Sequence, residues 1–146
     1  MTTTGYKLTD ADMRTHSGYQ WALGKTPTPC SGKGPLCTSG WFHYYLDPIL
    51  AVLLDPIHAG IGAEARLFRA EVGGEILHDR GLKAGCTEMT LVEELPVPTV
   101  TIAQRVLFAQ KCAAFAAAVA REPRMAPEKI AARLVQCATE AMKESA

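Results

Sequence analysis

The sequence predicts an α+β fold, with a small mixed or antiparallel sheet, a short helix and a C-terminal helical hairpin. Short apolar runs separated by turn residues fill the first two thirds of the chain, which is typical of strands. Helical periodicity dominates after Pro98. The 146 residues have the length of one domain, so we expect 1–146 to fold as a unit, with a sheet-rich part at 5–98 and the hairpin at 99–145.

Turns interrupt the N-terminal third of the chain. Residues 5–8 predict a short strand, residues 10–17 a polar turn and residues 19–23 a second strand. Residues 24–40 hold three prolines, four glycines and two cysteines. They predict a long loop, because proline removes backbone donors and glycine loses entropy in regular structure. Loops of this length in a compact domain are often functional.

An aromatic segment follows the loop. Residues 41–45 read Trp-Phe-His-Tyr-Tyr, and four aromatic side chains in five positions predict a strand. Asp47 and Pro48 then predict a helix start, with Asp as the N-cap and Pro at the first helical position. We expect this helix to continue through 49–54 and a glycine-containing loop to occupy 55–63.

Two further strands complete the expected sheet. Residues 65–72 alternate in polarity, with one bulge that switches the face. The Gly-Gly pair at 73–74 predicts a turn, and residues 75–78 are then the hairpin partner of 65–72. Residues 83–95 form the last strand, which Pro96 ends.

Two helices are expected after the sheet. Thr99 or Thr101 caps the first helix, which runs to Arg121, and Pro127 begins the second. The apolar face predicted for the first helix consists of Phe108, Cys112, Phe115 and Val119. The face predicted for the second helix consists of Ile130, Leu134, Cys137 and Ala141. An antiparallel hairpin packed on the sheet follows from these two faces.

Amino-acid composition disfavours several classes of function. Lys and Arg number 15, as do Asp and Glu, so no chain-wide positive field exists and nucleic-acid binding is not expected. Five cysteines and no N-terminal signal pattern predict free thiols in a reducing cytoplasm. The longest apolar run, 112–120, is shorter than the roughly 20 residues of a spanning helix, so no membrane insertion is expected.

Two roles are possible for His43. It could bind a ligand or act as a general base, or it could be a core histidine bonded to the backbone. Cys30, Cys37 and His43 have the wrong spacing for a structural zinc site, which begins with two cysteines separated by about two to four residues. We therefore predict neither a metal nor a cofactor.

Several short motifs along residues 5–98 occur in the order that is found in a known family. They are Tyr6-Lys7 in the first strand, Cys-Thr-Ser-Gly-Trp-Phe-His at 37–43, the stretch Arg-Leu-Phe-Arg-Ala-Glu-Val-Gly-Gly-Glu-Ile at 66–76, and the strand at 83–91. Together they resemble a small domain of unknown function from phage and prophage proteins, sometimes joined to pentapeptide repeats. Trp41 is an insertion relative to that pattern, and the acidic residue of 66–76 comes one place early. The resemblance implies a phage or prophage setting and supplies no activity.

The primary functional hypothesis is an accessory protein that binds a host or phage protein in the host cytoplasm. A counter-immunity inhibitor of a bacterial defence complex is one concrete form of it. Aromatic side chains anchor interfaces, although packing within the sheet explains them equally well. The binding residues predicted on this basis are Trp21, Trp41, His43, Tyr44 and Tyr45.

Two alternatives remain open. The strand pattern is loosely similar to ADP-ribosyltransferases, which implies an enzyme or a nucleotide-binding sensor. Tyr6 and His43 would then hold a nicotinamide dinucleotide, and Glu88, or else Glu93 or Glu94, would stabilise the oxocarbenium-like centre. The second alternative is a virion-associated or scaffold component that forms a homo-oligomer through the helices of Thr99–Ser145.

Overall fold

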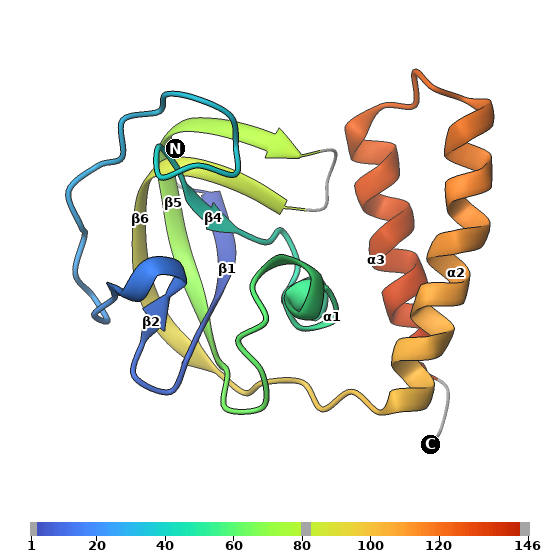
Figure 1. The fold of residues 1–146 in the computed structure, drawn as a ribbon, viewed down its shortest axis with the longest axis horizontal. Coiled ribbons are helices and arrows are strands. Elements are labelled where there is room, and N and C mark those ends of the chain that lie inside the picture. Colours follow the sequence, from blue (N-terminus) through green and yellow to red (C-terminus); the bar gives the residue numbers. More distant parts are fainter. Residues whose placement is uncertain (1–2, 80–82, 144–146) are drawn as a thin grey trace.

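The computed structural model describes residues 3–79 and 83–143 of the chain. The predicted α+β class is confirmed, with a curled four-stranded antiparallel sheet and three helices. In Figure 1 the sheet, α1, α3 and α2 follow one another across the molecule. The last two residues of the predicted hairpin, 144 and 145, lie outside the described part.

The sheet curls until its two edges meet. Its order is β1 (Thr3–Thr9), β5 (Arg66–Asp79), β6 (Lys83–Leu95) and β4 (Phe42–Tyr44), and all neighbours are antiparallel. Tyr6 N–H donates to the Tyr45 carbonyl at 2.9 Å, and Tyr45 N–H donates to the Tyr6 carbonyl at 2.8 Å. This bridge places β1 beside the end of β4, far from it in sequence (Figure 1).

The turn predicted at 73–74 is wrong. β5 continues through both glycines, and residues 75–78 extend the same strand and pair with β6. The register shifts between Gly73 and Ile76, and Gly74 has a φ of 70°, so the pair forms a bulge. Thr87 Oγ1 accepts from Glu75 N–H at 2.9 Å, which satisfies a donor that the bulge displaces from the ladder.

Helix α1 (Pro48–His58) starts where predicted and ends later. Asp47 accepts from Ile49 N–H at 2.8 Å, as an N-cap does. The helix continues through Pro56, so the loop predicted at 55–63 is wrong for its first four residues. Proline removes the bond to the carbonyl four residues earlier, and that carbonyl, on Val52, instead accepts from Arg105 at 3.4 Å.

Helices α2 (Ile102–Arg121) and α3 (Pro127–Lys143) form the predicted hairpin. Thr101 is the cap, and it exchanges bonds with Gln104 in a capping box. The predicted inner faces are confirmed except at Val119, since Phe108, Leu134 and Cys137 are buried with the leucines of α1 in one apolar cluster that does not include Val119. The same cluster includes Leu8 and Leu67. Helix α1 packs on β1 of the sheet and α3 packs on α1, so the hairpin lies mainly against α1, not directly on the sheet as predicted (Figure 1).

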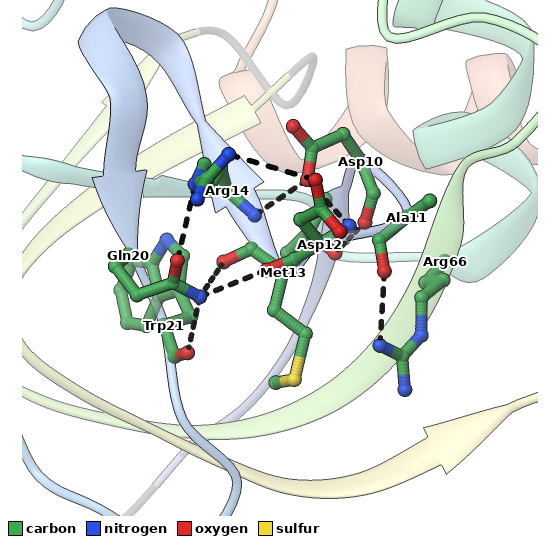
Figure 2. A network of polar contacts seen from close by, with 9 residues as sticks. Asp10, Ala11, Asp12, Met13, Arg14, Gln20, Trp21 and Arg66 are labelled. Atoms are coloured by element: carbon green, nitrogen blue, oxygen red, sulfur yellow. Dashed lines mark hydrogen bonds and ion pairs between the residues drawn. The ribbon is translucent and has the colours of Figure 1, made fainter.

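The other face of the sheet is covered by an N-terminal arm, β2 (Arg14–Thr15), η1 (His16–Gly18) and β3 (Tyr19–Gln20). The strand predicted at 19–23 is shorter than expected, and part of the predicted turn at 10–17 forms β2. Figure 2 shows the polar network that fixes the arm. Asp10 accepts from Arg14 N–H at 2.7 Å, and the Gln20 amide donates to the carbonyls of Asp12, Met13 and Trp21.

The predicted loop at 24–40 is confirmed and runs along β6. Gly24 N–H donates to the Leu91 carbonyl at 2.7 Å, and Cys30 N–H donates to the Thr87 carbonyl at 2.8 Å. The loop and the arm together enclose a second apolar cluster that includes Trp21, Phe42, Tyr44, Phe68 and Met89.

Candidate functional site

A cleft of about 240 Å³ opens where the edges β1 and β4 meet. Its walls come from β1, the arm, the 24–40 loop, β4, the C-terminal end of α1 and the start of β6. An adjoining hollow of about 730 Å³ extends between the arm and the loop. The residues that line both are Lys7, Thr15, His16, Cys37 and His43.

Lys7 is the most perturbed cation in the cleft. Its Nζ donates to the His43 carbonyl at 2.6 Å and lies 5.5 Å from the centroid of the Trp21 ring. The pKa of Lys7 is lowered to about 8, mainly by burial and to a smaller extent by the positive charge of Lys83, although the thiols of Cys86 and Cys30 oppose the shift. Among residues 3–79 and 83–143, no carboxylate forms an ion pair with Lys7. The site therefore holds a desolvated ammonium group without a counter-charge.

Two histidines have fixed orientations in the walls. The His43 ring is hydrogen-bonded to the Leu36 carbonyl, and burial lowers the pKa of His43, so its ring is neutral at pH 7. His58 Nδ1 is hydrogen-bonded to the Tyr45 hydroxyl at 2.9 Å, and the two rings stack with centroids 5.8 Å apart. Burial lowers the pKa of His58 and raises the pKa of Tyr45.

Cationic groups outnumber acidic ones in the cleft. The described lining residues of the smaller hollow include two lysines, Lys7 and Lys83, but a single carboxylate, that of Asp55, and the lowered pKa values of His43 and His58 mean that their rings add no charge at pH 7. Asp55 is already occupied, since its oxygens accept from Ile61 N–H at 3.1 Å and from Gly62 N–H at 3.2 Å. Lys83 Nζ donates to Cys37 Sγ at 3.2 Å. The site suits an anion, and no group of three or more metal-ligating side chains occurs in the described part of the chain.

The aromatic residues predicted to bind a partner lie in the core. Trp21 is 3% exposed and Tyr44 is 1% exposed, and Trp41 and Tyr45 are also buried. Their side chains agree with the alternative interpretation, packing within the sheet. His43, Tyr44 and Tyr45 line the cleft, and both tryptophans line the adjoining larger hollow, so each of the five lines at least one of the two spaces. Their role in binding stays a prediction.

The residues of the ADP-ribosyltransferase hypothesis are not gathered at this cleft. His43 lines it, but Tyr6 packs against the helical cluster on the other face of the sheet. Glu88 is exposed on β6 opposite Gly73. Glu93 and Glu94 form ion pairs with Arg69 and Arg66, at 2.9 Å and 2.7 Å.

Sequence reasoning did not assign roles to Lys7, His16, His58 and Lys83. Three of them carry no local pattern that distinguishes them from solvated polar residues. Lys7 offers a weak signal, because it lies on the same strand face as Gly5 and Thr9, which are buried. That signal becomes visible only once the sheet is known to curl.

A second surface stands out on α2. Its outer face is defined by the exposed apolar side chains on the side of the helix opposite the buried Phe108, namely Ile102, Ala103, Val106, Ala109, Ala113, Ala116, Ala117 and Ala120, and the exposed polar Gln110 lies on the same stripe. Ile102 is 81% exposed and Val106 is 51% exposed. By length and composition alone, Ile102–Arg121 is the one helix in the described part of the chain that is apolar enough to cross a membrane.

Comparison with known proteins assigns the chain to a family. A family model described as Domain of unknown function (DUF7666) matches residues 3–103, so the chain belongs to this family. The matched region contains every residue that lines the cleft and ends at the start of α2. No curated protein and no solved structure matches the chain.

Proposed function

We propose that this domain is a non-catalytic accessory protein that binds a protein partner through the outer face of α2. The observation that carries the proposal is the exposure of this face, where Ile102 and Val106 project from a ridge of alanines. Contiguous exposed apolar surface marks interaction sites, and small side chains let a partner approach the helix backbone closely.

The contrast with α3 supports this assignment. An ordinary surface helix turns charged residues to solvent, and α3 does so with Glu128, Lys129 and Arg133. On α2 the charged Lys111 lies instead at the seam between the helices, where it pairs with Glu140 at 2.9 Å. Apart from Gln110, the outer face of α2 is therefore apolar in a position where a monomeric domain would place charge.

The family resemblance favours a phage or prophage setting for this interaction, with a host defence protein as the partner. The five cysteines, all free, are compatible with the reducing cytoplasm in which such a protein would act. If the protein were instead a virion or scaffold component, two copies of the chain would associate through the same face of α2. The enzymatic alternative gains no support from the separate positions of Tyr6, His43 and Glu88.

A pair of matched variants tests the proposal. Ala113→Glu places a carboxylate in the outer face of α2, and Ala132→Glu places the same group on the exposed side of α3. We expect tagged wild type and Ala132→Glu to retain a stoichiometric partner from host lysate, and Ala113→Glu to lose it. A set of captured proteins that is the same for all three would contradict the proposal.

Measurements on the purified chain distinguish other occupants of the face. Light scattering would reveal a dimer that Ala113→Glu dissociates, which would replace the foreign partner with a second copy. Flotation with lipid vesicles that only Ala113→Glu abolishes would replace it with a bilayer surface. Either result would overturn the proposed heterologous protein partner.

A further inference from the structure

The cleft between β1, β4 and α1 has a charge distribution that the proposed partner binding does not use. Lys7 and Lys83 line the same hollow, and each is without an ion-pair partner among the described residues. Their charges are close enough for Lys83 to depress the pKa of Lys7. An anion placed beside the desolvated ammonium group of Lys7 and within reach of Lys83 would relieve the repulsion between the two positive charges.

The hydrogen-bonding capacity of Lys7 is only partly used. Its ammonium group has three donors, and the described contacts give it one acceptor, the His43 carbonyl at 2.6 Å. Lys83 reaches the Cys37 sulfur at 3.2 Å, and sulfur is a weak acceptor. A phosphate group offers several strong acceptor oxygens and two negative charges, so it would satisfy both lysines at once.

The adjoining hollow has a different character. Its walls include the rings of Tyr19, Trp21, Trp41 and Phe42, together with Pro29. Tyr19 is 40% exposed, and it lies edge-on to Phe42 with the ring centroids 5.7 Å apart. A partly exposed ring in the wall of an aromatic hollow offers a stacking platform for a planar base.

We propose that this cleft binds a nucleoside monophosphate, with the phosphate held by Lys7 and Lys83 and the base stacked on Tyr19 in the adjoining hollow. The combined space suits such a ligand, because a phosphate occupies the hollow of about 240 Å³ and a nucleoside fits within the one of about 730 Å³. Cys37 and His43, which line both hollows, mark the boundary between the two parts of the ligand. This site does not depend on the outer face of α2.

Calorimetric titration tests the site directly. The probes are the 5′-monophosphates of adenosine, guanosine, cytidine and uridine, the four corresponding nucleosides, and inorganic phosphate, all at low salt and pH 6.5. We expect at least one monophosphate to saturate the protein and its nucleoside to bind at least about tenfold more weakly, because the charge-assisted bonds to phosphate are lost.

Variants then assign each part of the ligand. Lys7→Met and Lys83→Met should each weaken monophosphate binding at least about tenfold, whereas Lys25→Met, on the exposed loop outside both hollows, should leave it within about twofold. Tyr19→Leu should weaken the monophosphate and leave inorganic phosphate unchanged. Leu23→Ala, which is exposed and lines neither hollow, is its control.

Several results would overturn the proposal. One is the absence of saturation by every monophosphate at concentrations up to about 1 mM, because a built phosphate site should bind more tightly than this. Another is a nucleoside that binds as tightly as its monophosphate. A third is inorganic phosphate that binds as tightly as every monophosphate, since the base would then contribute nothing. Circular dichroism establishes that each variant is folded; if Lys7→Met does not fold, undiminished binding by folded Lys83→Met refutes the site.

Discussion

Replacing Lys7 with methionine should make the protein more stable at pH 7. Burial lowers the pKa of Lys7 from 10.5 to about 8, a difference of about 2.5 pH units. At about 1.36 kcal/mol per unit, holding the ammonium in the folded chain costs about 3 kcal/mol relative to the unfolded chain. Loss of the bond from Nζ to the His43 carbonyl offsets part of the gain, so Lys7→Met should raise the unfolding free energy by about 1–3 kcal/mol.

The pH dependence of this gain has a definite sign. Between pH 8 and 10.5 the unfolded chain binds more protons at Lys7 than the folded chain does, so the stability of wild type rises with pH in that window. The advantage of Lys7→Met should therefore be complete below pH 8 and shrink as the pH approaches 10.5. The charged or titratable groups that influence Lys7, namely Cys30, Cys86 and Lys83, are identical in both proteins, so the difference between the proteins isolates Lys7.

Urea unfolding followed by tryptophan fluorescence measures the effect, because Trp21 and Trp41 are both buried and unfolding exposes them. Wild type, Lys7→Met and the surface control Lys25→Met would be compared at pH 7, 8.5 and 10. A Lys7→Met protein that is less stable than wild type at pH 7, or a difference that stays constant across this range, would refute the reasoning.

Two further predictions concern the bulge and the thiols. Gly74→Ala should lower the urea midpoint more than Gly60→Ala, by at least about 1 kcal/mol in unfolding free energy, since both glycines have a positive φ but only at Gly74 would the new Cβ lie 2.1 Å from Thr87 Oγ1; equal losses would show that the bulge relaxes. In the folded protein Cys37, which is exposed, should react with a thiol reagent at pH 8, whereas Cys86, buried with its pKa raised to about 12, should react only after unfolding. Rapid labelling of Cys86 in peptide maps of the native protein would contradict this.

Local chemistry explains which elements could be predicted from the sequence. Asp47 with Pro48, and Thr101, cap helices by bonds within one turn, so their sequence neighbours suffice to identify them. The fate of 73–74 depends instead on pairing with β6, where Thr87 supplies a bond to the bulge. Helix α1 likewise continues through Pro56, and Arg105, distant in sequence, donates to the Val52 carbonyl that Pro56 leaves without its helical partner. Contacts of this kind leave no local pattern.

The candidate site was harder to predict for the same reason. Its lining residues extend from Lys7 to Lys83 and meet only because the sheet order β1-β5-β6-β4 brings the first and last strands together. The aromatic residues of 41–45 were identified as important, but their number indicated a strand and could not specify that the rings face inward from a curled sheet. The long 24–40 loop was predicted, and its contribution of Cys37 to the cleft follows from its bonds along β6.

The two proposed surfaces should be separable by mutation. The cleft lies within residues 3–103, the region that the family shares, whereas most of the outer face of α2 lies beyond residue 103. No residue of that face lines either hollow. Mutations at distant sites without shared partners act independently, so Ala113→Glu should leave nucleotide titrations unchanged, and Lys83→Met should leave partner capture unchanged. If Ala113→Glu instead weakened nucleotide binding, the hairpin and the sheet would be energetically coupled, and ligand binding in the cleft would then regulate the interaction on α2.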